Sequence, residues 1–175
     1  MLINKQWLID NNACLEDALF VLEKGIEYDG KQLIKLLLVE NKLSFANWLI
    51  VRLLSDEQAI KYAINAAESA LLIFENAYPN NEYPRQALSA AKAKLDSSSE
   101  ISDDAINKAS NDANDAAKGA DIIVGRHAAE ACNYAAATAC TRNVQYSAIT
   151  AIHASKAMGT TMRLYIVYGL SLLNE

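Results

Sequence analysis

Proline and glycine are scarce in this 175-residue chain, which contains two prolines and six glycines. So few glycines argue against a phosphate-cradling loop, and no nucleotide-binding or nucleophile-elbow motif occurs in the sequence. Aromatic residues make up only 7% of the chain, although 52% of its residues are hydrophobic. Alanine is the largest contributor to this apolar share. Because alanine has the highest helix propensity, the composition favours helices.

Cysteine and long hydrophobic runs are also rare. The three cysteines, Cys14, Cys132 and Cys140, are odd in number and form no CxxC pair, so we expect reduced thiols in a cytoplasmic protein. The most apolar stretches, 33–39 and 45–54, are far shorter than the roughly 20 residues that span a bilayer. The first residues do not resemble a signal peptide. We therefore expect no membrane partner.

The charge balance is mildly acidic. Sixteen basic and twenty-one acidic residues leave a formal net charge of -5. A direct nucleic-acid binder normally carries a basic excess on one face, so this balance argues against that function. It is compatible with a partner protein that has a basic surface, such as a nucleic-acid enzyme. Solubility alone explains a mild acidic excess equally well.

Apolar residues recur at helical spacing along most of the chain, and no stretch shows strand-type alternation. We predict an all-α fold, a single-domain, alanine-rich bundle of about seven to nine helices, long enough to bury a core without metals or disulfides. Residues 1–96 form the N-terminal helices, and 97–175 form alanine-rich helices and a closing helix. One helix over the whole alanine-rich region would be about 85 Å long, so we expect breaks near Gly119–Gly125 and near 141–143.

Capping patterns predict where helices begin in the first half of the chain. Asn11 or Asn12 can cap the first helix, and Ser44 can cap the apolar helix that carries a tryptophan. Ser55 and Gln58, in the sequence SDEQ, are predicted to form a capping box at the start of the next helix. We interpret that tryptophan, Trp48, as a core anchor. Residues 25–30, GIEYDG, have the composition of a loop.

Both prolines lie in one short segment, YPNNEYPRQAL, and each follows a tyrosine. Pro79 cannot continue the helix before it and biases Tyr78 away from helical torsions. Pro84 stands at the predicted start of the next helix, where its missing N–H costs nothing. The segment is therefore predicted to end one helix and begin another, with Tyr78 and Tyr83 packed across the turn.

This turn also carries a family resemblance. A helix that ends in tyrosine-proline, followed by polar residues and an xPRxAL-x-AA pattern, resembles the Imm5-like group of bacterial immunity proteins. The matching residues are Tyr78, Pro79, Asn80, Asn81, Glu82, Pro84, Arg85, Ala87, Leu88, Ala90 and Ala91. Upstream, Ala13–Leu19 and Asn47–Leu54 look like the first helix and the tryptophan-bearing helix of that group. The resemblance implies an all-helical protein that neutralises a toxin by binding it.

Two sets of residues are candidates for partner binding. The first is the turn, because tyrosine and arginine are enriched at interface hot spots. The second is an acidic cluster at the start of the alanine-rich region, which can mimic phosphates toward a basic target; capping and an Asp104–Lys108 pair also explain much of it. The candidates are Tyr78, Asn80, Asn81, Glu82, Tyr83 and Arg85 in the turn, and Asp103, Asp104, Asp112 and Asp115 in the cluster.

No cofactor, metal or catalytic site is expected. His127 and Glu130 are three residues apart, and with Asp121 and His153 they suggest a ligand set, but no repeated H-x-x-E motif supports it. We interpret them as a structural hydrogen bond.

Three functions follow from these patterns. We favour a cytoplasmic, non-enzymatic inhibitor, either an immunity protein against a toxin or a phage-borne antagonist of a host defence nuclease such as a CRISPR effector. The alternative is a helical scaffold that self-associates. An enzyme centred on His127 and Glu130 is the least favoured. The chain is expected to be a monomer or a small homo-oligomer.

Overall fold

The computed structural model describes residues 1–25, 27–96 and 100–174, and within these ranges the chain forms ten helices and one small sheet. The helices are α1 (Lys5–Asp10), α2 (Leu15–Lys24), α3 (Gly30–Val39), α4 (Leu43–Leu53), α5 (Asp56–Ala77), α6 (Tyr83–Leu95), α7 (Asp103–Gly119), α8 (Ile123–Thr141), α9 (Val144–Met158) and α10 (Arg163–Leu172). The strands are β1 (Leu2–Asn4) and β2 (Glu27–Asp29). The predicted all-α class is confirmed.

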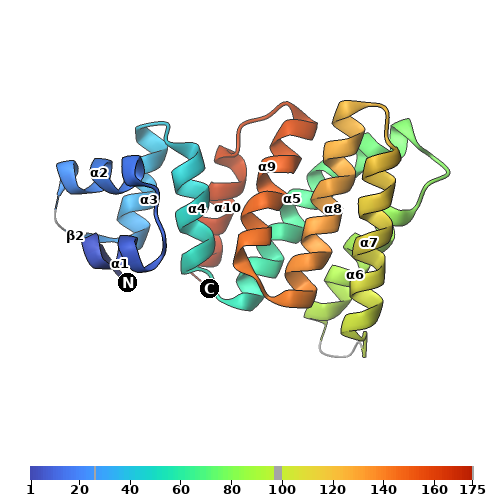
Figure 1. The fold of residues 1–175 in the computed structure, drawn as a ribbon, viewed down its shortest axis with the longest axis horizontal. Helices are drawn as coiled ribbons and strands as arrows, with labels where there is room; N and C mark the ends of the chain where they lie inside the picture. The colour runs from blue at the N-terminus through green and yellow to red at the C-terminus, as the bar shows by residue number, and fades with distance from the viewer. Residues whose placement is uncertain (26, 97–99, 175) are drawn as a thin grey trace.

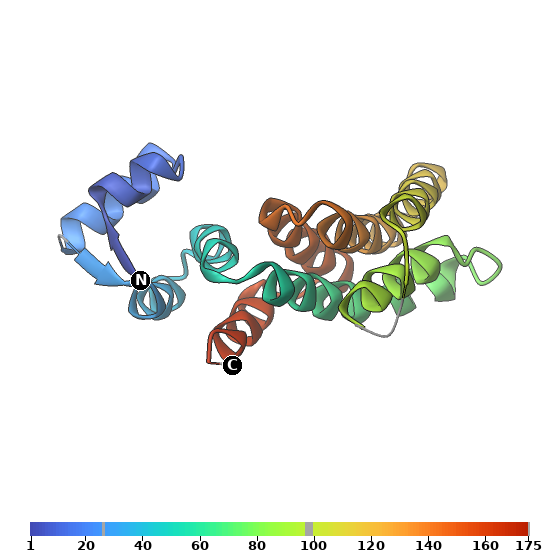
Figure 2. The same cartoon turned by 90° about the horizontal axis from the view of Figure 1, so that it is seen from below.

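The helices form an elongated row (Figure 1). The sheet and α1 to α3 lie at one end, α4 and α10 follow, and α5 to α9 form a five-helix bundle at the other end. α4 connects the two ends, since it packs against α3, α9 and α10. Figure 2 shows α1 and α2 set away from the bundle.

The first forty residues differ most from the sequence prediction. β1 and β2 pair antiparallel, with Leu2 opposite Asp29, so the loop predicted over 25–30 is partly a strand; residue 26 lies outside the described residues. Strands of three residues are too short to show a period-2 pattern. The six-residue helix α1 was also missed. With this helix the described residues form ten helices rather than the predicted seven to nine.

Two predicted caps are wrong. Asn11 is the C-cap of α1, and Asn12 has a left-handed backbone with φ 55°. The N-cap of α2 is Cys14, whose thiol accepts a hydrogen bond from the backbone N–H of Asp17. Ser44 lies inside α4, which begins one residue earlier. The predicted capping box at the start of α5 is confirmed, with Ser55 and Gln58 each bonding the other's backbone N–H.

Alanine lets the helices of the bundle approach one another closely, because its side chain is short. α8 packs against α5, α6, α7 and α9, so it lies at the centre of the bundle. Its buried face is mostly alanine. The fully buried alanines are Ala128, Ala129, Ala131, Ala135, Ala136 and Ala139.

The alanine-rich region breaks where the sequence predicted. α7 ends at Gly119 and α8 begins at Ile123. The second break is a left-handed Arg142 followed by Asn143, whose side chain accepts a hydrogen bond from the backbone N–H of Gln145 and caps α9. Both breaks turn the chain back, so α7, α8 and α9 lie side by side (Figure 1).

A buried polar link joins three helices of the core. The hydroxyl of Tyr62 on α5 donates to Oδ1 of Asn47 on α4 at 2.7 Å, and Nδ2 of Asn47 donates to the carbonyl of Ala148 on α9 at 3.0 Å. The residues Asn47 and Tyr62 are at most 1% exposed. Burial raises the pKa of Tyr62 far above its usual range, so its hydroxyl stays a donor.

The three free thiols are expected to differ strongly in reactivity. Cys132 is fully buried, and burial raises its pKa to about 12. Cys14 is exposed, and its hydrogen bond to Asp17 also raises its pKa. Because only the thiolate reacts and the protein shields the sulfur of Cys132 from the reagent, Cys132 should be alkylated about 100-fold more slowly than Cys14 at pH 8. Timed alkylation with peptide mass spectrometry measures both rates. The rates should converge in denaturant; similar rates in the native protein would contradict the buried position of Cys132.

Candidate partner-binding site

The turn between α5 and α6 has the predicted organisation. α5 ends at Ala77, directly before Tyr78 and Pro79, and Pro84 lies in the first turn of α6. Within the turn, the backbone N–H of Asn81 donates to the carbonyl of Tyr78 at 3.0 Å, and the side chain of Asn81 accepts from the N–H of Tyr83 at 3.2 Å. The first proline thus ends one helix and the second begins the next.

Tyr78 connects this turn to the α7–α8 connection, which lies at the same end of the bundle (Figure 1). Its hydroxyl donates to the carboxylate of Asp121 and accepts from the backbone N–H of Ile122 at 3.0 Å. The hydrogen bond from Tyr78 lowers the pKa of Asp121. A Cβ atom at Gly125 would lie 2.9 Å from the Tyr78 ring, so only glycine permits this approach. The ring of Phe74 packs on Tyr78 at a centroid distance of 4.9 Å.

Arg85 fixes the start of α6 against α5. Its Nε and Nη2 atoms lie 2.5 and 2.6 Å from the two carboxylate oxygens of Glu75. This two-pronged pair raises the pKa of Arg85. The turn is therefore held by its own backbone, by Tyr78 and by Arg85, although Arg85 itself remains largely exposed.

A pocket of about 240 Å³ opens beside the turn. It brings three of the predicted turn residues together with one of the four predicted aspartates. Its lining residues are Phe74, Tyr78, Asn81, Tyr83, Asp115, Ala116, Gly119 and Ala120. Asn80 and Glu82 are exposed and line a neighbouring hollow of about 340 Å³ with Asn81, Tyr83 and Gln86.

Asp103 and Asp104 do not form one cluster with the turn. Asp103 and Asp104 begin α7, and at 1.5 Å per residue they lie about 24 Å along the axis from the end of α7 that lines the pocket. Lysine side chains neutralise most of the negative charge of the four predicted aspartates. Nζ of Lys94 lies 2.7 Å from Oδ1 of Asp103. This lysine lowers the pKa of Asp103.

Two further aspartates are paired within α7. Nζ of Lys108 lies 2.6 Å from Oδ2 of Asp112, and Nζ of Lys118 lies 3.0 Å from Oδ1 of Asp115. Lys108 therefore pairs with Asp112, one turn beyond it on α7, and not with Asp104 as the sequence predicted.

Sequence reasoning missed three exposed apolar residues next to Tyr78. Ile122, Ile123 and Val124 are 46%, 67% and 42% exposed, and Tyr83 across the pocket is 47% exposed. We call these four residues the apolar corner. Three consecutive β-branched residues at a helix start cannot all face the interior of a helix bundle. The sequence could therefore have indicated that some of them are exposed.

A second hollow of about 360 Å³ lies between α4 and α9. Trp48, which the sequence predicts as a core anchor, packs against the core but is only partly buried and lines this hollow. The guanidinium of Arg52 stacks 3.9 Å from the Trp48 ring centroid, and desolvation lowers the pKa of Arg52. Ile149 and Ile152 line the opposite wall.

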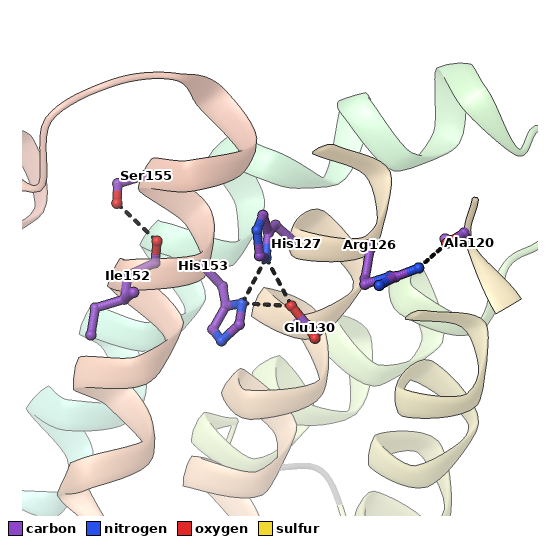
Figure 3. Close-up of polar contacts among 7 residues, drawn as sticks. All are labelled: Ala120, Arg126, His127, Glu130, Ile152, His153 and Ser155. Atoms are coloured by element: carbon purple, nitrogen blue, oxygen red, sulfur yellow. Dashed lines mark hydrogen bonds and ion pairs between the residues drawn. The ribbon is translucent and has the colours of Figure 1, made fainter. Parts of the chain in front are cut away.

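Two histidines and a glutamate meet between α8 and α9 (Figure 3). Nδ1 of His127 lies 2.9 Å from Oε2 of Glu130, and Nδ1 of His153 lies 2.6 Å from the same oxygen. The two Nδ1 atoms are 3.2 Å apart. Burial lowers the pKa of His153. Asp121, the fourth residue of the set considered from sequence, is bonded to Tyr78 instead.

No match was found among curated proteins or among solved structures. No helix in the described ranges combines the length and hydropathy needed to cross a bilayer. A family described as "Imm-5 like putative immunity protein" matches residues 50–161, from the last turn of α4 to just beyond α9. The match includes the proline turn, the pocket beside it and the whole five-helix bundle, and it covers more than half of the sequence. The chain therefore belongs to this immunity-protein family.

Proposed function

We propose that this protein is a non-enzymatic inhibitor that binds a protein toxin and blocks its action, and that the apolar corner and the pocket beside it make the central contact. Membership of the immunity-protein family supports a protein partner. The observation that carries the choice of surface is that four exposed apolar residues gather at this corner. Tyr83 lines the pocket, and Ile122–Val124 follow the pocket residue Ala120 and are tied to Tyr78 through the N–H of Ile122.

The rigidity of this region favours binding. Association is weakened by the entropy lost when loops and side chains become ordered at an interface. Tyr78 and Arg85 already hold the turn in place in the free chain. Apolar side chains that surround a preformed pocket are the common centre of a protein interface, with polar residues at its rim. Asn80 and Glu82 are placed to form such a rim.

Charge supports a basic partner. The chain carries a formal net charge of -5, and Asp115 borders the pocket while Glu82 is exposed nearby. Complementary charge speeds encounter with a basic protein. Toxins that act on nucleic acids have the basic surface that this requires. Since lysines pair with most aspartates of α7, we place the apolar corner rather than the acidic residues at the centre of the contact.

The test begins with the native host. The tagged chain is purified from lysate, and a stoichiometric partner is identified by mass spectrometry. That partner is then expressed alone and together with this chain. We expect growth arrest by the partner alone and recovery on co-expression. A partner that belongs to a defence nuclease would indicate counter-defence instead. Recovery of no stoichiometric partner, or of one that is not inhibited, would exclude the inhibitor function.

A further inference from the structure

We propose that His127, Glu130 and His153 form a metal site that binds one divalent transition-metal ion, with Zn²⁺ as the ion best matched to the ligands. His127 and Glu130 lie one turn apart on α8, and His153 faces them from α9 (Figure 3). Among the described residues, this is the group of histidine, cysteine and carboxylate side chains whose ligand atoms all lie within 4.8 Å of one another. The inference does not rest on the proposed inhibitor function.

The distances fit an ion after a small adjustment. Zinc lies about 2.0–2.2 Å from imidazole nitrogens and carboxylate oxygens, so the ligand atoms of a tetrahedral site lie about 3.3–3.6 Å from one another. The observed separations are 2.9 Å, 3.2 Å and 2.6 Å. The shortest, between Glu130 and His153, must open by roughly 0.7–1.0 Å, which rotation of the glutamate side chain provides.

The ligand types select the kind of ion. Two imidazoles and one carboxylate suit zinc and its neighbours in the first transition row, whereas magnesium and calcium prefer oxygen ligands alone. Both histidines present the same atom, Nδ1, to the centre. A metal ion would take the place of the protons that the three side chains otherwise share.

The surroundings hold the ligands in place and leave room for a further ligand. The side chains of His127, Glu130 and His153 are 22%, 25% and 17% exposed, so the cluster is neither sealed nor fully solvated. The ring of Tyr134 stacks on His153 at a centroid distance of 5.4 Å, and Tyr146 packs on Tyr134 in turn. Three protein ligands with one accessible side leave a coordination position for water or for a side chain of a partner.

Zinc binding should bridge two helices. His127 and Glu130 belong to α8 and His153 to α9, so a bound ion would tie these neighbours together. A ligand that binds only the folded state stabilises it. At a free zinc concentration of 100 times the dissociation constant, we expect the thermal midpoint to rise by roughly 5–10 °C.

The test uses the full chain after removal of metal with a chelator. Calorimetric titration with ZnCl₂ should give one ion per chain. Co²⁺ should give visible ligand-field bands that Zn²⁺ abolishes. His153→Ala and the isosteric Glu130→Gln should each weaken zinc binding at least about tenfold. Should His153→Ala fail to fold, judged by circular dichroism, Glu130→Gln and the wild-type titration decide the result.

Cys14→Ser is the matched control, because the exposed Sγ of Cys14 lies 2.9 Å from Oδ2 of Asp17 and this thiol–carboxylate pair could bind zinc adventitiously. This variant should retain full affinity for zinc. Absence of zinc binding by the wild-type chain would overturn the proposal. Unchanged affinity in Glu130→Gln, or loss of binding in Cys14→Ser, would place the ion elsewhere and overturn it equally.

Discussion

Replacing Asn47 with alanine is expected to lower the free energy of unfolding by about 2–4 kcal/mol, although the change removes only a few atoms. The substitution leaves the hydroxyl of Tyr62 buried without its acceptor, since among the described residues this hydroxyl bonds to Asn47 alone. It also removes the donor to Ala148 on α9 and leaves a cavity where α4, α5 and α9 meet. Chemical denaturation followed by circular dichroism measures the loss.

The controls separate the polar link from side-chain volume. Tyr62→Phe alone should cost less, about 1–2 kcal/mol, because Asn47 keeps its bond to Ala148. Asn47→Leu combined with Tyr62→Phe replaces both partners by apolar groups and should recover part of the stability that Asn47→Ala loses. A loss below about 0.5 kcal/mol for Asn47→Ala would mean that the link contributes little.

The sequence predicted the helical parts of this fold well because they depend on local chemistry. Serine followed three residues later by glutamine identified the start of α5, and the two prolines identified the turn after it. The link between Asn47 and Tyr62 could not be predicted, because these residues are fifteen positions apart and lie on different helices. The short strand pair is also non-local: β1 and β2 are separated by two helices.

The candidate site was predicted in part, for the same reason. The turn residues Tyr78, Asn81 and Tyr83 are close in sequence, so the pattern found them together. Ile122 was missed because only the fold brings the α7–α8 connection to Tyr78. The meeting of His153 with Glu130 depends on the packing of α9 against α8, which spacing along a single helix does not reveal.

The second large effect is expected at the apolar corner: Ile123→Asp should weaken binding of the partner by about 100-fold or more, which corresponds to about 3 kcal/mol. Ile123 is 67% exposed, so the isolated chain loses little packing. It is also the first residue of α8, where a negative charge favours the helix dipole. The variant should therefore fold as well as the wild type, and the loss comes from burying an unpaired carboxylate in the interface.

Two companion variants make this result interpretable by surface plasmon resonance with the partner that the lysate purification recovers. Ile123→Ser removes the apolar side chain without adding charge and should weaken binding about tenfold. Val39→Asp places the same carboxylate on a residue that is 82% exposed at the end of α3, at the opposite end of the row (Figure 1), and should bind like the wild type. Because a carboxylate at a helix C-terminus is slightly unfavourable, Val39→Asp perturbs folding more than Ile123→Asp does. Equal affinities for the two aspartate variants would therefore show that the partner does not contact the apolar corner.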